Sequence, residues 1–246
     1  MNVITTPNSH GDGITVVGPN SATRDDPHGR VFKGEYTVIE DRIVDFSGVP
    51  IGEKHQDGGI DCVDGANALI QYCVIRNVGK AMLCGNENGT ATVTLEDCII
   101  GNCGRRCPEA QGKGTVVTMR RCVVRRWGNP KRWDTRGFGA WAHHGGVIRA
   151  EDCVFLPGPF FNGRFWADLI GHIGQAWNDK SRTVKDYLTL GVMRGLTAGP
   201  GGKVSAVNCY APWWVILEGH EGPRMPEAEA RALMERLEHL CRAAKN

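Results

Sequence analysis

Residues 91–102, ATVTLEDCIIGN, decide the fold, because variants of this stretch recur along the chain. Each variant joins a β-rich run to a cysteine: ALIQYCVIRN at 68–77, TVVTMRRCVVRR at 115–126, GVIRAEDCVF at 146–155 and KVSAVNCYA at 203–211. Cys73, Cys98, Cys122 and Cys153 follow one another at intervals of 25, 24 and 31 residues. A repeat this short cannot bury an apolar face alone and must stack on copies of itself. With no helical run between the strands, the period predicts an all-β parallel β-helix.

The repeat extends over much of the chain. YTVIEDRIVDF at 36–46 has the same form, with Arg42 in the place of the cysteine. We expect a single domain over 1–246, with regular coils over about 31–156, an irregular excursion at 157–203, and a terminal coil and helix at 204–246. The two intervals of 31 residues contain inserted loops, 47–56 and 128–137. Solenoids usually place binding function in such loops along one edge.

The last stretch, PEAEARALMERLEHLCRAAKN at 226–246, predicts an amphipathic helix. Its first turn contains proline and acids, and its apolar residues recur at helical spacing: Leu233, Met234, Leu237, Leu240 and Cys241. We expect this helix to pack on the solenoid and to close an end whose strand edges would otherwise invite aggregation.

Composition defines the cellular setting only in part. The 246 residues carry a net charge of +2 and contain no apolar run of 18 residues, so we expect no membrane span. The N-terminal sequence MNVITTPNSHGDG lacks the charged region and apolar stretch of a secretory signal, so we expect either that the protein is not secreted or that a signal has been removed. Ten cysteines could form disulfides in a secreted chain, but five of them share one phase of the repeat. We therefore expect those five to form an inward-facing ladder of free thiols.

Two groups of charges fit the repeat itself. Seven basic residues lie within 120–136, where Asp134 is the one acid: Arg120, Arg121, Arg125, Arg126, Lys131, Arg132 and Arg136. Such a patch favours a polyanion, and a solvated face of coils is an equally good interpretation. Three acidic pairs all precede the key residue of a repeat: Glu40-Asp41, Glu96-Asp97 and Glu151-Asp152. We interpret these pairs as turn residues rather than as catalytic carboxylates.

Five charged residues are left without a role in the repeat: Asp57, Asp61, Lys80, Arg105 and Arg106. Counting back sixteen residues from successive key cysteines places Asp57, Met82 and Arg106 in one column. Asp57 and Arg106 would then lie about 10 Å apart on one sheet face. Carboxylates there would suit a hard cation such as Ca²⁺, and the basic residues would face an anionic substrate. A surface ladder of salt bridges is the alternative.

Residues 31–156 resemble the central coils of pectate lyases, in the pectate/pectin lyase family of polysaccharide lyases. Three ordered motifs carry the resemblance: Asp57-x-x-x-Asp61, Lys80-Ala-Met-Leu-Cys-Gly85, and Asn102-x-x-x-Arg106-Cys-Pro108 followed by Gly112. The resemblance implies a right-handed parallel β-helix and β-elimination on a uronic-acid polymer, most simply pectate or polygalacturonate.

The same resemblance implies roles for single residues. Asp57 and Asp61 would be calcium ligands, Lys80 would bind and neutralise the substrate carboxylate, and Arg106 would abstract the C5 proton. An arginine base requires calcium and Lys80 nearby to make its guanidinium a better proton acceptor. Gln111 stands where many members have a second arginine, so that substrate contact is missing or is supplied by Lys113 or Arg105. The upstream aspartate pair that often completes the calcium site has no clear counterpart, with Asp64 and Glu53 as candidates.

Other functions remain open. DGGID also resembles polygalacturonases, but the next coil, NVGKAMLCG, offers no acid for a glycoside hydrolase. A non-catalytic polysaccharide-binding or spike-like β-helix would stack sugars on tryptophan: Trp127, Trp133, Trp141, Trp213 or Trp214. Trp141 is also our candidate substrate contact for the lyase. No nucleic-acid-binding motif accompanies the basic patch. His10, His143 and His144 are possible metal or acid/base residues, but histidines alone are weak evidence for such a site. We expect a monomeric, secreted or periplasmic enzyme that acts on an acidic polysaccharide, with no nucleic-acid or membrane partner.

Overall fold

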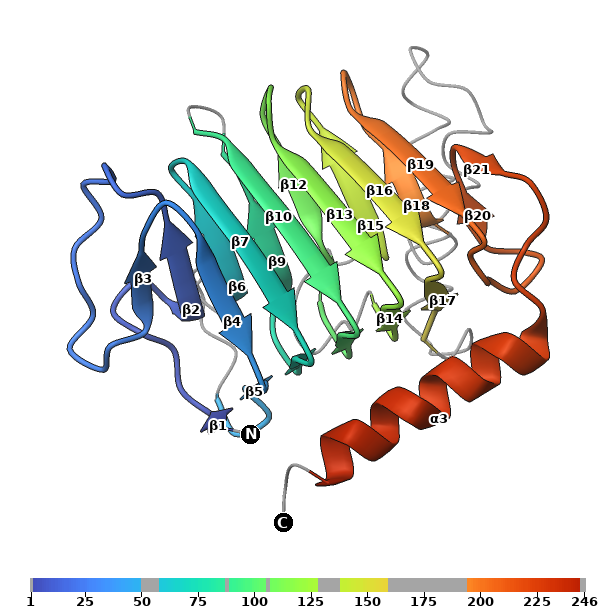
Figure 1. Cartoon of the computed structure of the whole chain (residues 1–246), viewed down its shortest axis with the longest axis horizontal. Coiled ribbons are helices and arrows are strands. Elements are labelled where there is room, and N and C mark those ends of the chain that lie inside the picture. The colour runs from blue at the N-terminus through green and yellow to red at the C-terminus, as the bar shows by residue number, and fades with distance from the viewer. Residues whose placement is uncertain are drawn as a thin grey trace, which may run out of the picture.

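The computed structural model describes residues 2–49, 58–86, 89–104, 107–127, 138–158 and 194–243, and its strands form three parallel sheets (Figure 1). The six-stranded sheet consists of β1 (Asn2–Ile4), β5 (Arg42–Asp45), β8 (Val74–Arg76), β11 (Ile99–Gly101), β14 (Val123–Arg125) and β17 (Val154–Leu156). The seven-stranded sheet consists of β4 (Thr37–Glu40), β7 (Ala66–Gln71), β10 (Ala91–Glu96), β13 (Val116–Arg120), β16 (Val147–Glu151), β19 (Lys203–Val207) and β21 (His220–Glu221). The eight-stranded sheet consists of β3 (Val31–Lys33), β2 (Asp12–Val17), β6 (Gly58–Val63), β9 (Lys80–Cys84), β12 (Glu109–Gln111), β15 (Ala140–His143), β18 (Arg194–Ala198) and β20 (Ile216–Leu217).

The chain visits the three sheets in a fixed cyclic order. It runs from β6 to β7 to β8, then from β9 to β10 to β11, and the next two coils repeat the same sequence of sheets. Each strand pairs in parallel with its counterpart in the next coil, as Val93 does with Val117. Figure 1 shows the coils side by side along the long axis of the molecule. The predicted all-β architecture of stacked parallel strands is confirmed, and this order is consistent with a parallel β-helix.

The cysteine phrase marks the interior of the stack. Cys73, Cys98, Cys122, Cys153 and Cys209 all have at most 1% of their surface exposed. Their thiols donate to backbone carbonyls inside the stack, as Cys98 Sγ does to Ile70 O at 3.4 Å. All nine cysteines whose side chains the structure describes are free and buried. The predicted inward-facing ladder of free thiols is therefore confirmed for this part of the chain.

The aspartate of each acidic pair is a turn residue, as predicted, whereas Glu40, Glu96 and Glu151 are the last residues of strands. Asp41, Asp97 and Asp152 have φ of 54°, 51° and 53°, the left-handed conformation that turns the chain between two sheets. Asp adopts this conformation more readily than most residues because its short side chain can bond the local backbone. These carboxylates therefore shape the corner of each coil.

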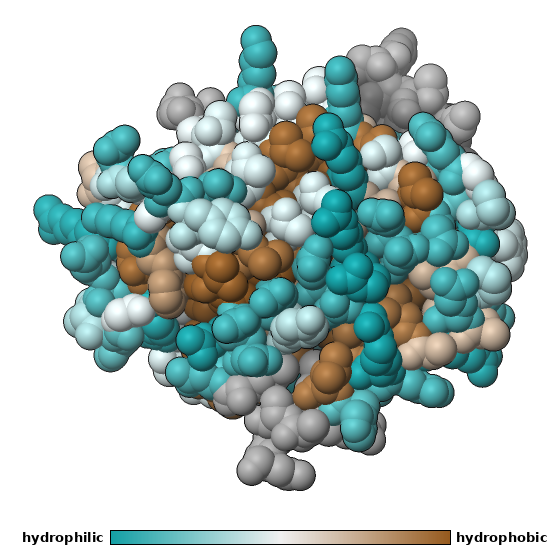
Figure 2. Space-filling model, viewed as in Figure 1, coloured by the Kyte–Doolittle hydropathy of each residue, from teal (hydrophilic) through white to brown (hydrophobic). Residues whose placement is uncertain are grey.

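Much of the basic patch is neutralised by these acids. Arg120 contacts Glu96 and Glu151 at 3.2 and 3.4 Å, and Arg121 contacts Asp97 at 3.0 Å. Figure 2, viewed as in Figure 1, shows hydrophilic side chains running across this face with apolar patches between them. Lys131, Arg132 and Arg136 lie outside the described residues. The described part of the patch thus fits a solvated face of paired charges better than a polyanion site.

The C-terminal helix α3 (Glu227–Ala243) is present, but its predicted position at an end of the stack is wrong. It lies across the outer face of the six-stranded sheet (Figure 1), where five of the six strands each contribute one aliphatic residue: Ile43, Val74, Ile99, Val123 and Val154. Leu233 and Leu237 pack on this apolar ladder, and Arg236 binds Asp97 at 2.7 Å. An apolar ladder on an outer face needs a cover, and α3 supplies it.

The irregular excursion is shorter than expected within the described residues. The sequence predicted irregular structure at 157–203, yet Arg194–Ala198 forms the regular strand β18 and pairs with β15. Residues 159–193 lie outside the described part. No helix that the structure describes is long and apolar enough to cross a membrane.

Candidate functional site: an acidic cluster on the eight-stranded sheet

Several of the predicted site residues lie on neighbouring strands of the eight-stranded sheet. Asp61 is on β6, Lys80 begins β9, Gln111 ends β12 and Trp141 is on β15. Lys113 is exposed in the turn that follows β12. Asp57, Arg105 and Arg106 lie outside the described residues, as does Glu53. The sheet therefore brings Asp61 and Lys80 together on adjacent strands, and the predicted base is not among the residues that can be placed.

The observed pairing of strands differs from the prediction that Asp57, Met82 and Arg106 share one column of the sheet. Met82 was expected in the column of Asp57, but Met82 pairs with Ile60 and is buried in the core. Lys80 pairs with Gly58 instead. The turn between β9 and β10 contains six residues, whereas the turn between β6 and β7 contains two, so counting back from the cysteines gives a shifted phase. The outward column that results joins Thr15, Asp61, Leu83, Glu109 and Trp141.

Asp12 is the main residue that the sequence prediction missed. Asp12 begins β2 and pairs with Gly58 of β6. Its side chain forms a hydrogen bond with that of Asp61, on the same strand as Gly58. A Cβ on Gly58 would lie 2.2 Å from Asp12 Oδ1 and 3.1 Å from Asp61 Oδ1, so glycine leaves the space that both carboxylates occupy. The signal that could have found Asp12 is the similarity of DGITVV at 12–17 to GGIDCV at 58–63. Asp12 precedes the first coil recognised from the cysteine phrase, and it was therefore not considered.

Burial gives both carboxyl groups an unusual affinity for protons. Burial raises the pKa of Asp12 to about 6, although the Thr15 hydroxyl, the Lys80 charge and a hydrogen bond with Asp61 act in the opposite direction. Burial raises the pKa of Asp61 well above its usual range, and the negative charges of Asp12 and Glu109 add to this effect while Lys80 opposes it. Two buried carboxyls in contact cannot both be charged cheaply unless a cation joins them.

The pair fits a hard cation in its donor chemistry. Asp61 Oδ1 is buried and accepts no hydrogen bond from any described residue, so it is an oxygen ligand without a partner. Thr15 Oγ1 donates to Asp12 Oδ2 at 3.1 Å and orients that carboxylate. Carboxylate oxygens are the ligands that Ca²⁺ prefers. Within the described residues, no group of three or more Asp, Glu, His or Cys is placed to hold a metal, and this pair could offer a cation two carboxylates.

A second buried pair lies farther along the same sheet face. Glu109 Oε1 and His143 Nε2 are 2.6 Å apart, and both side chains are at most 6% exposed. Glu109 is on β12 and His143 on β15, and His143 Nδ1 is also buried without a hydrogen bond to a described residue. The sequence prediction gave His143 little weight and did not consider Glu109. The one available signal was that both residues stand on the outward phase of strands in which inward positions are apolar.

Trp141 stacks with two other rings. Its indole stacks on His143 with centroids 3.8 Å apart, and Phe138 stacks parallel to it at 5.4 Å. Gly199 lies against the indole edge, because a Cβ there would be 2.8 Å from Trp141 Nε1. These rings cover part of the Trp141 surface on which a sugar would stack. This geometry favours a packing role that orients His143, and the predicted sugar contact of Trp141 stays a prediction.

The chain is thus a mostly-strand protein of three parallel sheets with ionisable side chains buried on one outer face. No protein-family model, curated protein or solved structure matches this chain. Its function must therefore be argued from the chemistry of Asp12, Asp61 and Lys80.

Proposed function

We propose that this chain is a polysaccharide lyase that cleaves a uronic-acid polymer, most simply polygalacturonate, by calcium-assisted β-elimination on a right-handed parallel β-helix. The observation that supports this most is the buried pair of Asp12 and Asp61 beside Lys80 on one face of the eight-stranded sheet. Buried carboxylates with raised pKa values reduce the stability of the folded state and are typical of functional sites.

Each residue has a distinct role in the proposed reaction. Lys80 binds the uronate carboxylate and neutralises its charge. Arg106, assigned from the family resemblance, removes the proton from C5. The electron pair of that C–H bond forms the C4=C5 double bond, the bond from C4 to the glycosidic oxygen breaks, and this oxygen leaves with a proton from water. Charge neutralisation at the carboxylate is what makes the C5 proton acidic enough to remove.

Asp61 and Asp12 would hold the calcium, together with Asp57 as predicted from the motif. The unpaired Asp61 Oδ1 and the raised pKa values of both carboxyls support this assignment, because a cation would relieve both. Bound calcium would polarise the uronate carboxylate as a Lewis acid. Two protein carboxylates leave other positions for water and for the substrate itself, so we expect binding to strengthen when the polymer is present.

Hydrolysis of the same polymer is the second candidate, and Glu109 favours it. Glu109 and Asp61 stand in one outward column with Leu83 between them, so their strands are about 10 Å apart. Inverting glycoside hydrolases separate their two carboxyls by about 6.5–9.5 Å. Asp12 and Asp61, by contrast, touch each other and are too close for that role. Hydrolysis would use Glu109 and Asp61 as its acid and base.

The proposed setting follows from the substrate. An enzyme acting on a cell-wall polymer would work as a monomer, secreted or in a periplasm, with the acidic polysaccharide as its partner. A non-catalytic polysaccharide-binding β-helix would use the same face without turnover.

A polymer panel tests the proposal. Polygalacturonate, methylated pectin, alginate and glucuronan would each be incubated with the protein in calcium and in EDTA. A lyase produces an unsaturated uronide that absorbs in the near ultraviolet, and EDTA should abolish this signal until calcium is restored. New reducing ends without absorbance would establish hydrolysis instead. Binding without either product would leave only the non-catalytic function.

A further inference from the structure

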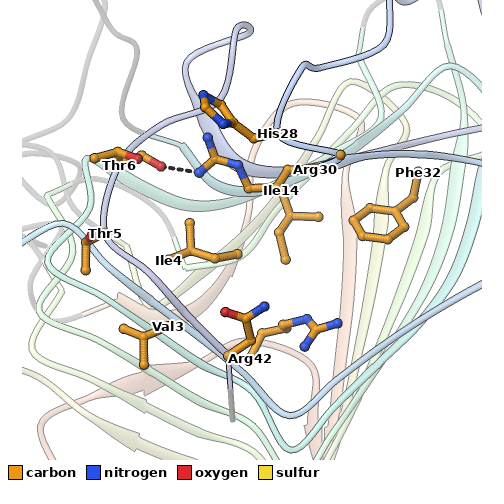
Figure 3. A pocket seen from close by; sticks show the side chains of 11 residues that line it. Val3, Ile4, Thr5, Thr6, Ile14, His28, Arg30, Phe32 and Arg42 are labelled. Carbon is orange, nitrogen blue, oxygen red and sulfur yellow. Dashed lines mark hydrogen bonds between the residues drawn. The ribbon is translucent and has the colours of Figure 1, made fainter.

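A pocket of about 350 Å³ opens at the N-terminal end of the stack, among β1, β2, β3 and β5 (Figure 3). Its lining includes three basic residues and no acid: His28, Arg30 and Arg42. Figure 3 shows His28 and Arg30 at one side and Arg42 at the other, with Ile4, Ile14 and Phe32 between them. The volume lies within the range of small-molecule sites, about 300–1,000 Å³.

Arg42 occupies a position that the later coils give to a buried thiol. Ile43 pairs with Val74, so Arg42 stands one coil before Cys73 in the cysteine ladder. Cys73 is 1% exposed, and the next ladder residues are fully buried. An arginine at this inward-facing position is costly unless its charge is paired. In the first coil the position opens into the pocket, and Arg42 is a lining residue there.

The charge of Arg42 is not used by the described residues. Its side chain makes no hydrogen bond or ion pair with any residue that the structure describes. Arg30 differs, because its guanidinium donates to Thr6 O and Pro7 O at 2.5 and 3.1 Å and lies 3.7 Å from Asp26. Arg30 therefore shapes the wall, and Arg42 is the guanidinium that is available to a ligand.

We propose that this pocket binds a hydroxylated organic carboxylate of the sugar-acid type. Arg42 would take the carboxylate, for which a planar guanidinium is the best-matched side chain. Asn2, Thr5 and Thr6 line the pocket with groups that can bond hydroxyls, while Phe32, Ile4 and Ile14 offer an apolar surface to the C–H face of a ring. No residue of the Asp12 and Asp61 cluster lines the pocket, so the site is separate from the proposed catalytic centre and does not depend on lyase activity.

Calorimetric titration with D-galacturonate, D-galactose and hexanoate tests the ligand class. Galacturonate should bind, galactose should bind at least about tenfold more weakly because it lacks the charge, and hexanoate should also be weaker because it lacks hydroxyls. Galactose or hexanoate binding as tightly as galacturonate would overturn the proposal.

Arg42→Cys is the sharpest variant, because it restores the residue that the other coils use at this position. In a Lys80→Ala background, where the proposed catalytic centre has lost its uronate contact, galacturonate should still bind, and adding Arg42→Cys should weaken that binding by about tenfold or more. Loss of binding in Lys80→Ala with retention in Arg42→Cys would place the ligand at the catalytic face and refute the pocket.

Methyl NMR of the wild-type chain avoids dependence on any variant. Galacturonate should shift the methyl resonances of Ile4 and Ile14, which line the pocket, and not that of Ile148, which lies in the core of a distant coil. Unshifted Ile4 and Ile14 at saturating ligand would contradict the proposed site.

Discussion

At the scale of single residues, Gly58 determines whether Asp12 and Asp61 can meet. The ladder puts Gly58 beside Asp12, and the two carboxylate oxygens occupy the space where a Cβ would stand. The nearest atom to that Cβ is the end of the Asp12 side chain, which can rotate away. An added methyl group should therefore displace the carboxylate without breaking the fold.

Gly58→Ala should lower activity on polygalacturonate by about 10- to 100-fold, because misplacing a catalytic group by about 1 Å costs this much. The melting temperature should change little. Gly48→Ala is the matched control, since a Cβ at Gly48 would meet no atom within 4 Å. Equal activity of the two variants would show that the arrangement around Gly58 does not matter.

Asp12 should give stability a distinctive pH dependence. Its pKa of about 6 in the folded state exceeds the ordinary value of 3.8, so the folded chain holds a proton that the unfolded chain releases between these values. The stabilisation is complete at low pH and is lost as pH rises through about 6, by about 3 kcal/mol for the isolated shift. Urea unfolding in EDTA at pH 4 and pH 7 should show this loss in the wild type and a smaller one in Asp12→Asn. The same pH dependence in both proteins would contradict the raised pKa.

Sequence reasoning found part of this site. Asp61 and Lys80 were recognised because they did not fit the repeat and matched a known motif. Asp12 was missed because its coil lacks the cysteine phrase. Glu109 was missed, and His143 was given little weight, because a buried contact between their strands depends on the register between coils. Register could not be counted from the cysteines, since the turn after β9 is longer than the turn after β6.

At the scale of elements, α3 and the outer aliphatic ladder of the six-stranded sheet stabilise each other. Leu237 is 1% exposed against this ladder, whereas Leu240, one turn later, is 39% exposed. The helix was predictable from its periodicity, but the face it covers was not. Val74, Ile99 and Val123 stand next to the cysteines, and the sequence pattern did not distinguish their outward direction from the core.

Leu237→Ala should lower the free energy of unfolding by about 2–5 kcal/mol, as expected for a buried leucine. Leu240→Ala is the control in the same helix and should cost about 0.5 kcal/mol or less. Denaturant melts of both variants measure the difference. Similar costs for the two would mean that α3 does not pack on the sheet as described.

The thiol ladder makes a prediction about chemical reactivity. The nine described cysteines are buried and free, so a water-soluble thiol reagent should not label them in the native protein. After denaturation without reductant, all nine should react, as counted in a Cys241→Ser variant that removes the tenth cysteine of the chain. Fewer than nine reactive thiols would reveal disulfides and would contradict the ladder of free cysteines.

At the scale of the whole molecule, the repeat explains both the stack and the position of the site. The cysteine phrase predicted the coils because each coil must bury the same inward positions, and β-rich runs between turns define strands directly. The connections that lead into the eight-stranded sheet have different lengths, and several of them contain residues outside the described part. In the sequence, one of these connections contains Arg106 and another ends shortly before Asp61.

We expect this face of the molecule to perform β-elimination. The most direct measurement is the near-ultraviolet absorbance of polygalacturonate incubated in calcium with the wild type, Asp61→Asn and Lys80→Ala. The wild type should give a steady rise in absorbance, and each variant should be at least about 100-fold slower, because Asp61→Asn weakens the proposed calcium site and Lys80→Ala removes the charge that neutralises the substrate carboxylate. Reducing ends that appear without absorbance, or a rise of equal rate in all three proteins, would contradict the claim.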